Sequence, residues 1–151
     1  MKSFVRFCLA ALFAIAYSMP GYSQQNDVYI TISNIRSDRG KVRIALYDRV
    51  DQFPDEPWKS YTFEKAQLDD GSLQVTLIDI PPGLYAISIL DDEDENDRMK
   101  YGILRIPKEG YGFSNNAKPG MKCPPFEECS FRVNQGNNYL HIEMQYFREK
   151  A

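Results

Sequence analysis

An acidic run is the part of this sequence with the clearest potential for metal chemistry. The run, DDEDENDR, occupies positions 91–98. Asp92, Asp94 and Asn96 within it follow the D-x-D-x-N spacing that presents alternate side-chain oxygens to calcium in loops of the EF-hand type. A calcium site in this run would take its ligands from Asp91, Asp92, Asp94, Asn96 and Asp97.

Two positions of the EF-hand pattern do not match, so a second interpretation stands beside the first. Asp97 occupies the place of the turn glycine, and Ile103 occupies the place of the bidentate glutamate. Glu93 and Glu95 add carboxylates, and calcium accepts irregular oxygen cages. The alternative is a solvated connection between two strands, whose charges keep that end of the sheet soluble. On this alternative the protein has no cofactor.

Nucleophilic or histidine-based catalysis has little support in the sequence. His141 is the only histidine, and in a strand it would share a polar face with Glu143. One histidine in such a position suggests no Ser–His–Asp or Cys–His set. The acidic residues crowd into one polar run, whereas a catalytic acid needs apolar surroundings that raise its pKa. We therefore predict that the protein is not an enzyme.

A glycine-rich aromatic stretch is the second candidate for binding. The stretch EGYGFSNN, positions 109–116, places Tyr111 and Phe113 beside glycines, within a segment expected to be a long loop, 105–120. Loops on β-sandwiches commonly carry binding residues. Exposed, these two rings and Trp58 would stack on a sugar ring or an aromatic peptide side chain. The alternative is that the two rings of the stretch pack against the sandwich edge and hold the loop down.

The N-terminus has the features of a cleavable secretory signal. Lys2 and Arg6 accompany an apolar run at 7–17 that is too short to span a bilayer. Small residues then stand at the −3 and −1 positions before Gln24. We expect removal of residues 1–23, export to the periplasm or the medium, and one β-sandwich domain over 24–151 without a membrane span.

Two cysteines, Cys123 and Cys129, remain in that exported chain, within CPPFEEC. An even number of cysteines in an exported protein favours a disulfide. The spacing is C-x5-C and not C-x-x-C, which favours a structural bridge over a redox-active pair.

Period-two alternation of apolar residues dominates the rest of the sequence and predicts strands. The seven clearest segments are DVYITISNI, KVRIALY, SLQVTLIDI, PPGLYAISIL, YGILRIP, CSFRVN and NYLHIEMQYF, with a weaker eighth in SYTFEKAQL. We expect the first two to form one hairpin and the last two to form another. The region 48–60 is predicted to be a loop with one helical turn. Short strands separated by Gly, Pro and Asp turns predict an all-β, antiparallel two-sheet sandwich of seven or eight strands, Ig-like in outline.

Three stretches resemble a known family. They are GKVRIALYD, PPGLYAISILDDEDEN, and IPKEGYGFSNNAKP with the PPFEECSFRV that follows it. They are similar to DUF2141, a family of exported bacterial proteins of unknown function, and the resemblance runs from about Val28 to Tyr146. The string PKEGYGFSN is specific, whereas PPGLYA also resembles turns of many transthyretin-like sandwiches. The resemblance implies a β-sandwich of that general kind and no established activity.

The sequence departs from the family pattern in the acidic run, which in relatives resembles HDEN-x-N-G-K-x-D. Asp91 stands in place of the histidine and Asp97 in place of the glycine, while Lys100 replaces the later aspartate and Arg105 a second glycine. If relatives hold a metal there, Lys100 removes one acidic ligand. The resemblance also implies small residues at the position of Cys129, so the disulfide would be particular to this chain.

These features predict an exported, non-catalytic protein with a binding or assembly role at the cell envelope. Its partner would be an envelope protein or a glycan, bound at the end that carries 91–98 and 111–116. The net charge is −3, and no cluster of Lys and Arg is present to neutralise phosphates, which excludes nucleic acid. The alternative is a calcium-stabilised carbohydrate-binding module, in which Tyr111, Phe113 or Trp58 stacks on a sugar ring.

Overall fold

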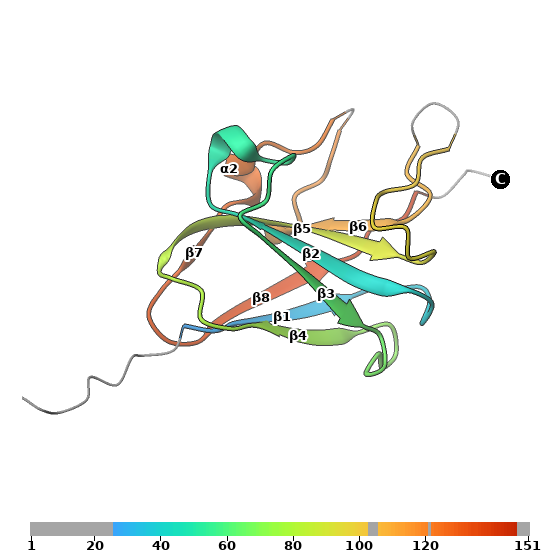
Figure 1. The fold of residues 1–151 in the computed structure, drawn as a ribbon, viewed down its shortest axis with the longest axis horizontal. Helices are drawn as coiled ribbons and strands as arrows, with labels where there is room; N and C mark the ends of the chain where they lie inside the picture. The colour runs from blue at the N-terminus through green and yellow to red at the C-terminus, as the bar shows by residue number, and fades with distance from the viewer. Residues whose placement is uncertain (1–25, 103–105, 121, 148–151) are drawn as a thin grey trace, which may run out of the picture.

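The alternating segments fold into two β-sheets that pack face to face (Figure 1). The structure, a computed structural model, describes residues 26–102, 106–120 and 122–147. Within these residues, eight strands form two mostly antiparallel sheets, which confirms the predicted β-sandwich. The predicted signal segment, residues 1–23, lies outside the described residues. No helix in the described part of the chain has the length and apolar character needed to cross a membrane.

The first sheet contains three of the described strands, in the order β4-β1-β8. They are β1 (Val28–Ser33), β4 (Leu73–Leu77) and β8 (Asn138–Glu143). β4 runs antiparallel to β1, with Val75 opposite Ile30. β8 runs parallel to β1, with Leu140 opposite Ile30, and this pairing departs from the predicted antiparallel arrangement.

The second sheet has the order β3-β2-β5-β6, and β7 pairs with the start of β5. Its strands are β2 (Lys41–Tyr47), β3 (Lys59–Glu64), β5 (Gly83–Asp92), β6 (Gly110–Phe113) and β7 (Phe131–Val133). The short helices η1 (Val50–Gln52), η3 (Ser114–Asn116) and α2 (Phe126–Cys129) complete the described elements. β3 confirms the weaker predicted strand, and η1 confirms the helical turn predicted within 48–60.

Alternate side chains of both sheets fill the space between them. On β2, Val42, Ile44 and Leu46 point inward and are at most 1 % exposed. Burying each such side chain contributes about 1.5–3 kcal/mol. Because side chains alternate along a strand, Arg43 and Ala45 must then lie on the opposite, outer face of the second sheet. The core therefore decides which side chains this sheet presents to solvent.

The two predicted hairpins are wrong. β1 and β2 follow each other in the sequence but lie in different sheets, and so do β7 and β8. A strand that buries one face shows the same alternation whether its sequence neighbour lies beside it or across the sandwich from it. The pattern therefore located the strands without specifying their partners.

The predicted long loop over 105–120 is interrupted by β6, in which Tyr111 pairs with Leu90 of β5. The inward positions of β6 are glycines because β8 and the chain that follows it pass very close. A Cβ atom on Gly112 would lie 2.9 Å from Cγ2 of Ile142. Tyr111 also exchanges backbone hydrogen bonds of 3.0 and 2.7 Å with Gln145, which ties the two sheets together at this edge.

The predicted strand YGILRIP does not form in the part that the structure describes. Tyr101 makes a single bridge to Pro107, and the amide of Gly102 donates a 2.7 Å hydrogen bond to the carbonyl of Ile106. Residues 103–105 lie outside the described residues. The described ends of this segment thus pair with each other within the long connection between β5 and β6.

Candidate functional site

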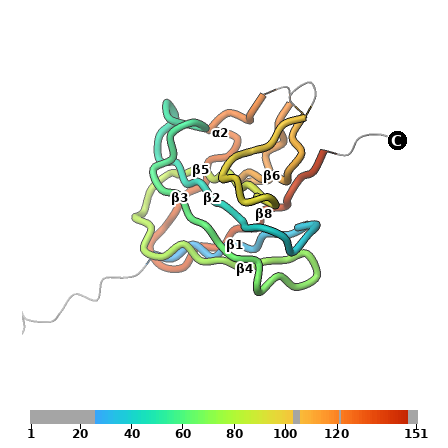
Figure 2. The backbone as a smooth tube through the Cα atoms, turned by 45° about the vertical axis from the view of Figure 1, so that its right-hand side comes forward, coloured from blue at the N-terminus to red at the C-terminus, as the bar shows by residue number. Residues whose placement is uncertain are grey.

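An open groove of about 540 Å³ lies on the outer face of the second sheet, the face turned away from the first sheet. Its floor consists of outward-facing residues of β2, β3 and β5, among them Ala45, Ser60, Ser88 and Leu90. One wall is the loop around η1, at Pro54 and Asp55, and the other is the segment after β5, at 97–101. Figure 2 traces the backbone of both segments. Two connections that are far apart in sequence therefore enclose one surface of the sheet.

The groove combines charged, hydroxyl and aromatic groups. Arg43 and Asp97 form an ion pair at its edge. The Tyr47 hydroxyl donates a 2.8 Å hydrogen bond to the carbonyl of Pro54 and lies 3.3 Å from Oγ of Ser88. Burial raises the pKa of Tyr47, so this hydroxyl stays protonated. Tyr101 is 59 % exposed and supplies an aromatic ring.

The structure separates the five predicted calcium ligands. Asp91 is fully buried and points inward, where it forms an ion pair with Lys65. Asp92 points to the opposite face, because β5 continues to that residue and its side chains alternate. Asp97 pairs with Arg43 at the groove. The five predicted ligands therefore do not meet at one point, although Asp92 and Asp94 remain close together.

A different trio of carboxylates does meet, and it includes Glu109, which lies outside the acidic run 91–98. Ligand atoms of Asp92, Asp94 and Glu109 lie within 4.8 Å of one another. Both oxygens of Asp92 accept backbone N–H groups, from Asn96 at 3.1 Å and Asp97 at 2.9 Å. Glu109 joins the trio through long-range packing, for which its position in the sequence gave no signal.

Glu109 and Lys100 complete the bonding of this carboxylate trio. The oxygens of Glu109 accept the backbone N–H groups of Glu93 at 3.2 Å and Lys100 at 2.9 Å. Nζ of Lys100 donates a 2.8 Å hydrogen bond to Asp94, and this hydrogen bond lowers the pKa of Asp94. Burial raises the pKa of Glu109. The carboxylates thus organise the loop backbone, and the nearby cation is supplied by the chain itself.

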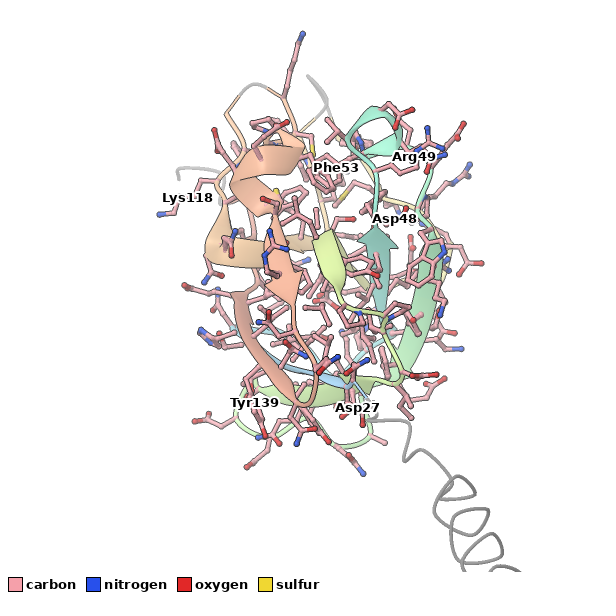
Figure 3. All side chains as sticks on the ribbon, turned by 90° about the vertical axis from the view of Figure 1, so that its left-hand side faces the viewer. Asp27, Asp48, Arg49, Phe53, Lys118 and Tyr139 are labelled. Atoms are coloured by element: carbon pink, nitrogen blue, oxygen red, sulfur yellow. The ribbon has the colours of Figure 1, made fainter. Side chains whose placement is uncertain are left out.

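The three aromatic candidates do not form one platform. Phe113 is only 9 % exposed, and its ring lies 6.2 Å from that of Tyr111 and 6.5 Å from that of Phe53. Phe53 is also 5.9 Å from Phe126, so it lies where the η1 loop and α2 come together (Figure 3). Trp58 packs instead against the ring of Tyr85, 5.8 Å away. Tyr111 and Phe113 thus contribute to a second apolar cluster at this end of the sandwich.

Two exposed tyrosines are not among the binding residues predicted from the sequence. Tyr101 borders the groove, whereas Tyr139, 74 % exposed, stacks on Tyr29 at 5.2 Å on the outer face of the first sheet. Tyr101 lies in a segment predicted as a strand, whereas in the structure it makes only an isolated bridge, to Pro107. The exposure of Tyr139 could have been predicted from the alternation along β8, which places its ring on the face of the strand that points away from the core.

The predicted disulfide between Cys123 and Cys129 is absent, and the structure contains both as free cysteines. α2 turns Cys129 into the second apolar cluster, while Cys123, which precedes the helix, is exposed. Burial raises the pKa of Cys129 to about 12, so its thiol is protonated and weakly reactive at neutral pH.

The fold and the groove define a β-sandwich protein with an open polar groove on one sheet. The chain belongs to the family described as an uncharacterized protein conserved in bacteria, DUF2141, whose profile matches residues 30–141. This match confirms the resemblance seen in the sequence. Neither a curated protein nor a solved structure matched the chain.

Proposed function

We propose that the protein is an exported, non-catalytic binding protein that holds a glycan in the groove of the second sheet. The observation that carries the proposal is the groove itself, in which the Arg43–Asp97 pair and the hydroxyl of Ser60 lie close to the exposed ring of Tyr101. Ligand sites combine a concave surface with a few convergent polar groups.

A sugar ring matches this mixture of groups. Its hydroxyls both donate and accept hydrogen bonds, and the groove offers guanidinium donors from Arg43, carboxylate acceptors from Asp97 and a serine hydroxyl. Its C–H face is apolar and packs against aromatic rings such as that of Tyr101. Leu90 and Ala45 supply the apolar part of the floor. An open groove also suits a segment of a longer chain, as in an envelope polysaccharide.

A binding role without catalysis is supported by the positions of the reactive side chains. His141 lies on β8 in the first sheet, where Nε2 is 2.8 Å from Oγ of Ser33. Cys129 is buried and protonated at neutral pH. Asp97, one of the two carboxylates that line the groove, is paired with Arg43. The N-terminal signal features support the exported location.

The proposal is tested by titrating the exported protein with oligosaccharides prepared from bacterial envelopes, using calorimetry. Tyr101→Ala is expected to weaken binding at least tenfold, because it removes the ring at the groove wall. Tyr139→Ala is the matched control, since this tyrosine is exposed on the other sheet. Equal weakening by both variants, or no saccharide binding at all, would overturn the glycan proposal.

A capture experiment distinguishes the other partner class named by the sequence. If an envelope protein binds the exported chain and Tyr101→Ala abolishes that binding while saccharides have no effect, the groove is a protein-binding site and the glycan proposal is wrong. If saccharides displace the captured protein, the two share the groove and the glycan proposal stands.

A further inference from the structure

A lysine and an aspartate face each other inside the sandwich, away from the groove. The side chain of Lys65 is 1 % exposed and that of Asp91 is 0 % exposed, and Nζ contacts Oδ1 directly. Lys65 comes directly after β3, and Asp91 lies near the end of β5. β2 separates these two strands in the sheet. The contact therefore joins two elements that do not pair with each other.

Two backbone carbonyls next to Nζ orient the amine of Lys65 relative to the carboxyl group of Asp91. Nζ donates hydrogen bonds to the carbonyls of Ser37 at 2.9 Å and Arg39 at 2.6 Å. A neutral amine has two N–H bonds and one lone pair, so these carbonyls accept both N–H bonds. The remaining direction, that of the lone pair, is the one in which Asp91 lies. The amine of Lys65 is thus held as a nucleophile that faces a carboxyl group.

The two oxygens of Asp91 have different environments. Oδ1 is buried and has no hydrogen-bond partner within the described residues, although it contacts Nζ. Oδ2 accepts a 2.6 Å hydrogen bond from the hydroxyl of Tyr146. Burial raises the pKa of that hydroxyl well above its usual value, which keeps it protonated as a donor. A fixed donor at a carboxyl oxygen stabilises the negative charge that develops when the carbon is attacked.

We propose that Lys65 and Asp91 condense to an intramolecular isopeptide bond, with Tyr146 as the hydrogen-bond donor that activates the carboxyl group. Nζ attacks Cγ of Asp91, a C–N bond forms, and the bond from Cγ to Oδ1 breaks. One proton first passes from the Lys65 ammonium to Oδ1 of Asp91, which gives the neutral amine and the carboxylic acid; together these two groups carry three protons. One stays on the amide nitrogen and two leave with Oδ1 as water. No oxidant, reductant or further reactant takes part.

The product satisfies this buried site better than the ion pair does. A charged pair taken out of water needs every polar atom to be hydrogen-bonded, and Oδ1 of Asp91 contacts Nζ without hydrogen-bond geometry. After condensation that oxygen is gone, no charge remains, and the amide oxygen keeps the hydrogen bond from Tyr146. The amide N–H keeps a carbonyl partner at Ser37 or Arg39. The cross-link would close the loop between residues 65 and 91 and limit unfolding, as a disulfide does.

This cross-link is independent of what the groove binds, and the mass of the protein tests it. The intact protein, purified after export, is expected to be lighter by one water, about 18 Da, than the mass calculated for the residues it retains. Proteolysis and tandem mass spectrometry are expected to yield a branched peptide that contains both Lys65 and Asp91. Lys65→Arg, checked for folding by circular dichroism, is expected to have the full mass, and Tyr146→Phe is expected to form the bond more slowly.

Two outcomes would overturn the proposal. One is a wild-type protein of full sequence mass, in which Lys65 and Asp91 are an ordinary buried ion pair. The other is a loss of water confined to Asp70–Gly71, where cyclisation of aspartate before glycine gives the same mass change without joining two peptides. Because the intact mass and the peptide map of the wild-type protein decide together, a variant that fails to fold does not leave the proposal untested.

Discussion

Tyr146 donates a hydrogen bond of 2.6 Å to Oδ2 of Asp91, and so connects the chain that follows β8 to the buried end of β5. The same hydroxyl accepts the backbone N–H of Arg36 at 3.1 Å, and the guanidinium of Arg36 lies 4.6 Å from the centre of the tyrosine ring. One side chain thus holds three separate segments at one end of the sandwich. This end is where the two sheets are also tied together through Gln145.

Replacing Tyr146 by Phe removes this hydroxyl and leaves the ring in place. We expect the free energy of unfolding to fall by about 1–3 kcal/mol, the usual cost of leaving a buried acceptor without its hydrogen bond. Chemical denaturation measures it. Tyr139→Phe is the control, because Tyr139 is 74 % exposed and its change should stay within about 0.5 kcal/mol. Equal stability of the two variants would contradict the role assigned to the Tyr146 hydroxyl.

Gly110 is predicted to tolerate no side chain. A Cβ atom at this position would overlap the ring of Tyr146, so Gly110→Ala forces a shift of that ring or of β6. Overpacking of this kind costs about 1–3 kcal/mol. Gly120→Ala is the matched control, since nothing lies within 4 Å of its added Cβ. Comparable melting temperatures for the two variants would contradict this prediction, because they would mean that a Cβ atom at position 110 fits beside the ring of Tyr146.

The strands of this protein could be predicted because each inward position carries an apolar side chain. Val42, Ile44 and Leu46 on β2 illustrate this pattern. β6 was not predicted, because its inward positions are Gly110 and Gly112. A glycine has no side chain and therefore adds nothing to an apolar alternation. Which strands pair could not be predicted, because alternation is the same for neighbours beside and across the sandwich.

The candidate sites were harder to predict because they depend on where a strand ends. The apolar alternation stops before Asp91, so the acidic run was assigned to a loop, yet β5 continues to Asp92. That extension sends two adjacent aspartates to opposite faces, one to Lys65 and the other to the loop backbone. The groove could not be predicted, because its walls are two connections that are far apart in the sequence, the loop around η1 and the segment after β5. Which connections lie beside each other depends on the pairing of the strands.

Calcium is predicted to leave the stability of the wild-type protein unchanged. The trio of Asp92, Asp94 and Glu109 already accepts four backbone N–H bonds, and Lys100 pairs with Asp94 at 2.8 Å. The melting temperature should therefore be the same in chelator and in excess calcium. A native-state site at a hundred times its dissociation constant would instead add about 2.7 kcal/mol. That shift, on the order of ten degrees, would restore the calcium-stabilised module as the better interpretation.

The ion pair between Arg36 and Glu93 predicts a dependence of stability on pH. The guanidinium donates hydrogen bonds of 2.8 and 2.7 Å to the two carboxylate oxygens, and this bonding lowers the pKa of Glu93 below its ordinary value of 4.5. The folded state then binds a proton less readily than the unfolded state. The stabilisation is therefore complete above about pH 5 and is lost as the pH falls through the lowered pKa.

The difference in unfolding free energy between the wild type and Glu93→Gln measures this contribution. Because Arg36 is 44 % exposed, we expect only about 0.5–1 kcal/mol at neutral pH, shrinking towards zero in acid. Glu143→Gln is the control, since that side chain is exposed and makes no ion pair within the described part of the chain. A difference that persists unchanged into acid would mean that Glu93 stabilises the loop through packing, because only the ionised carboxylate can pair with Arg36.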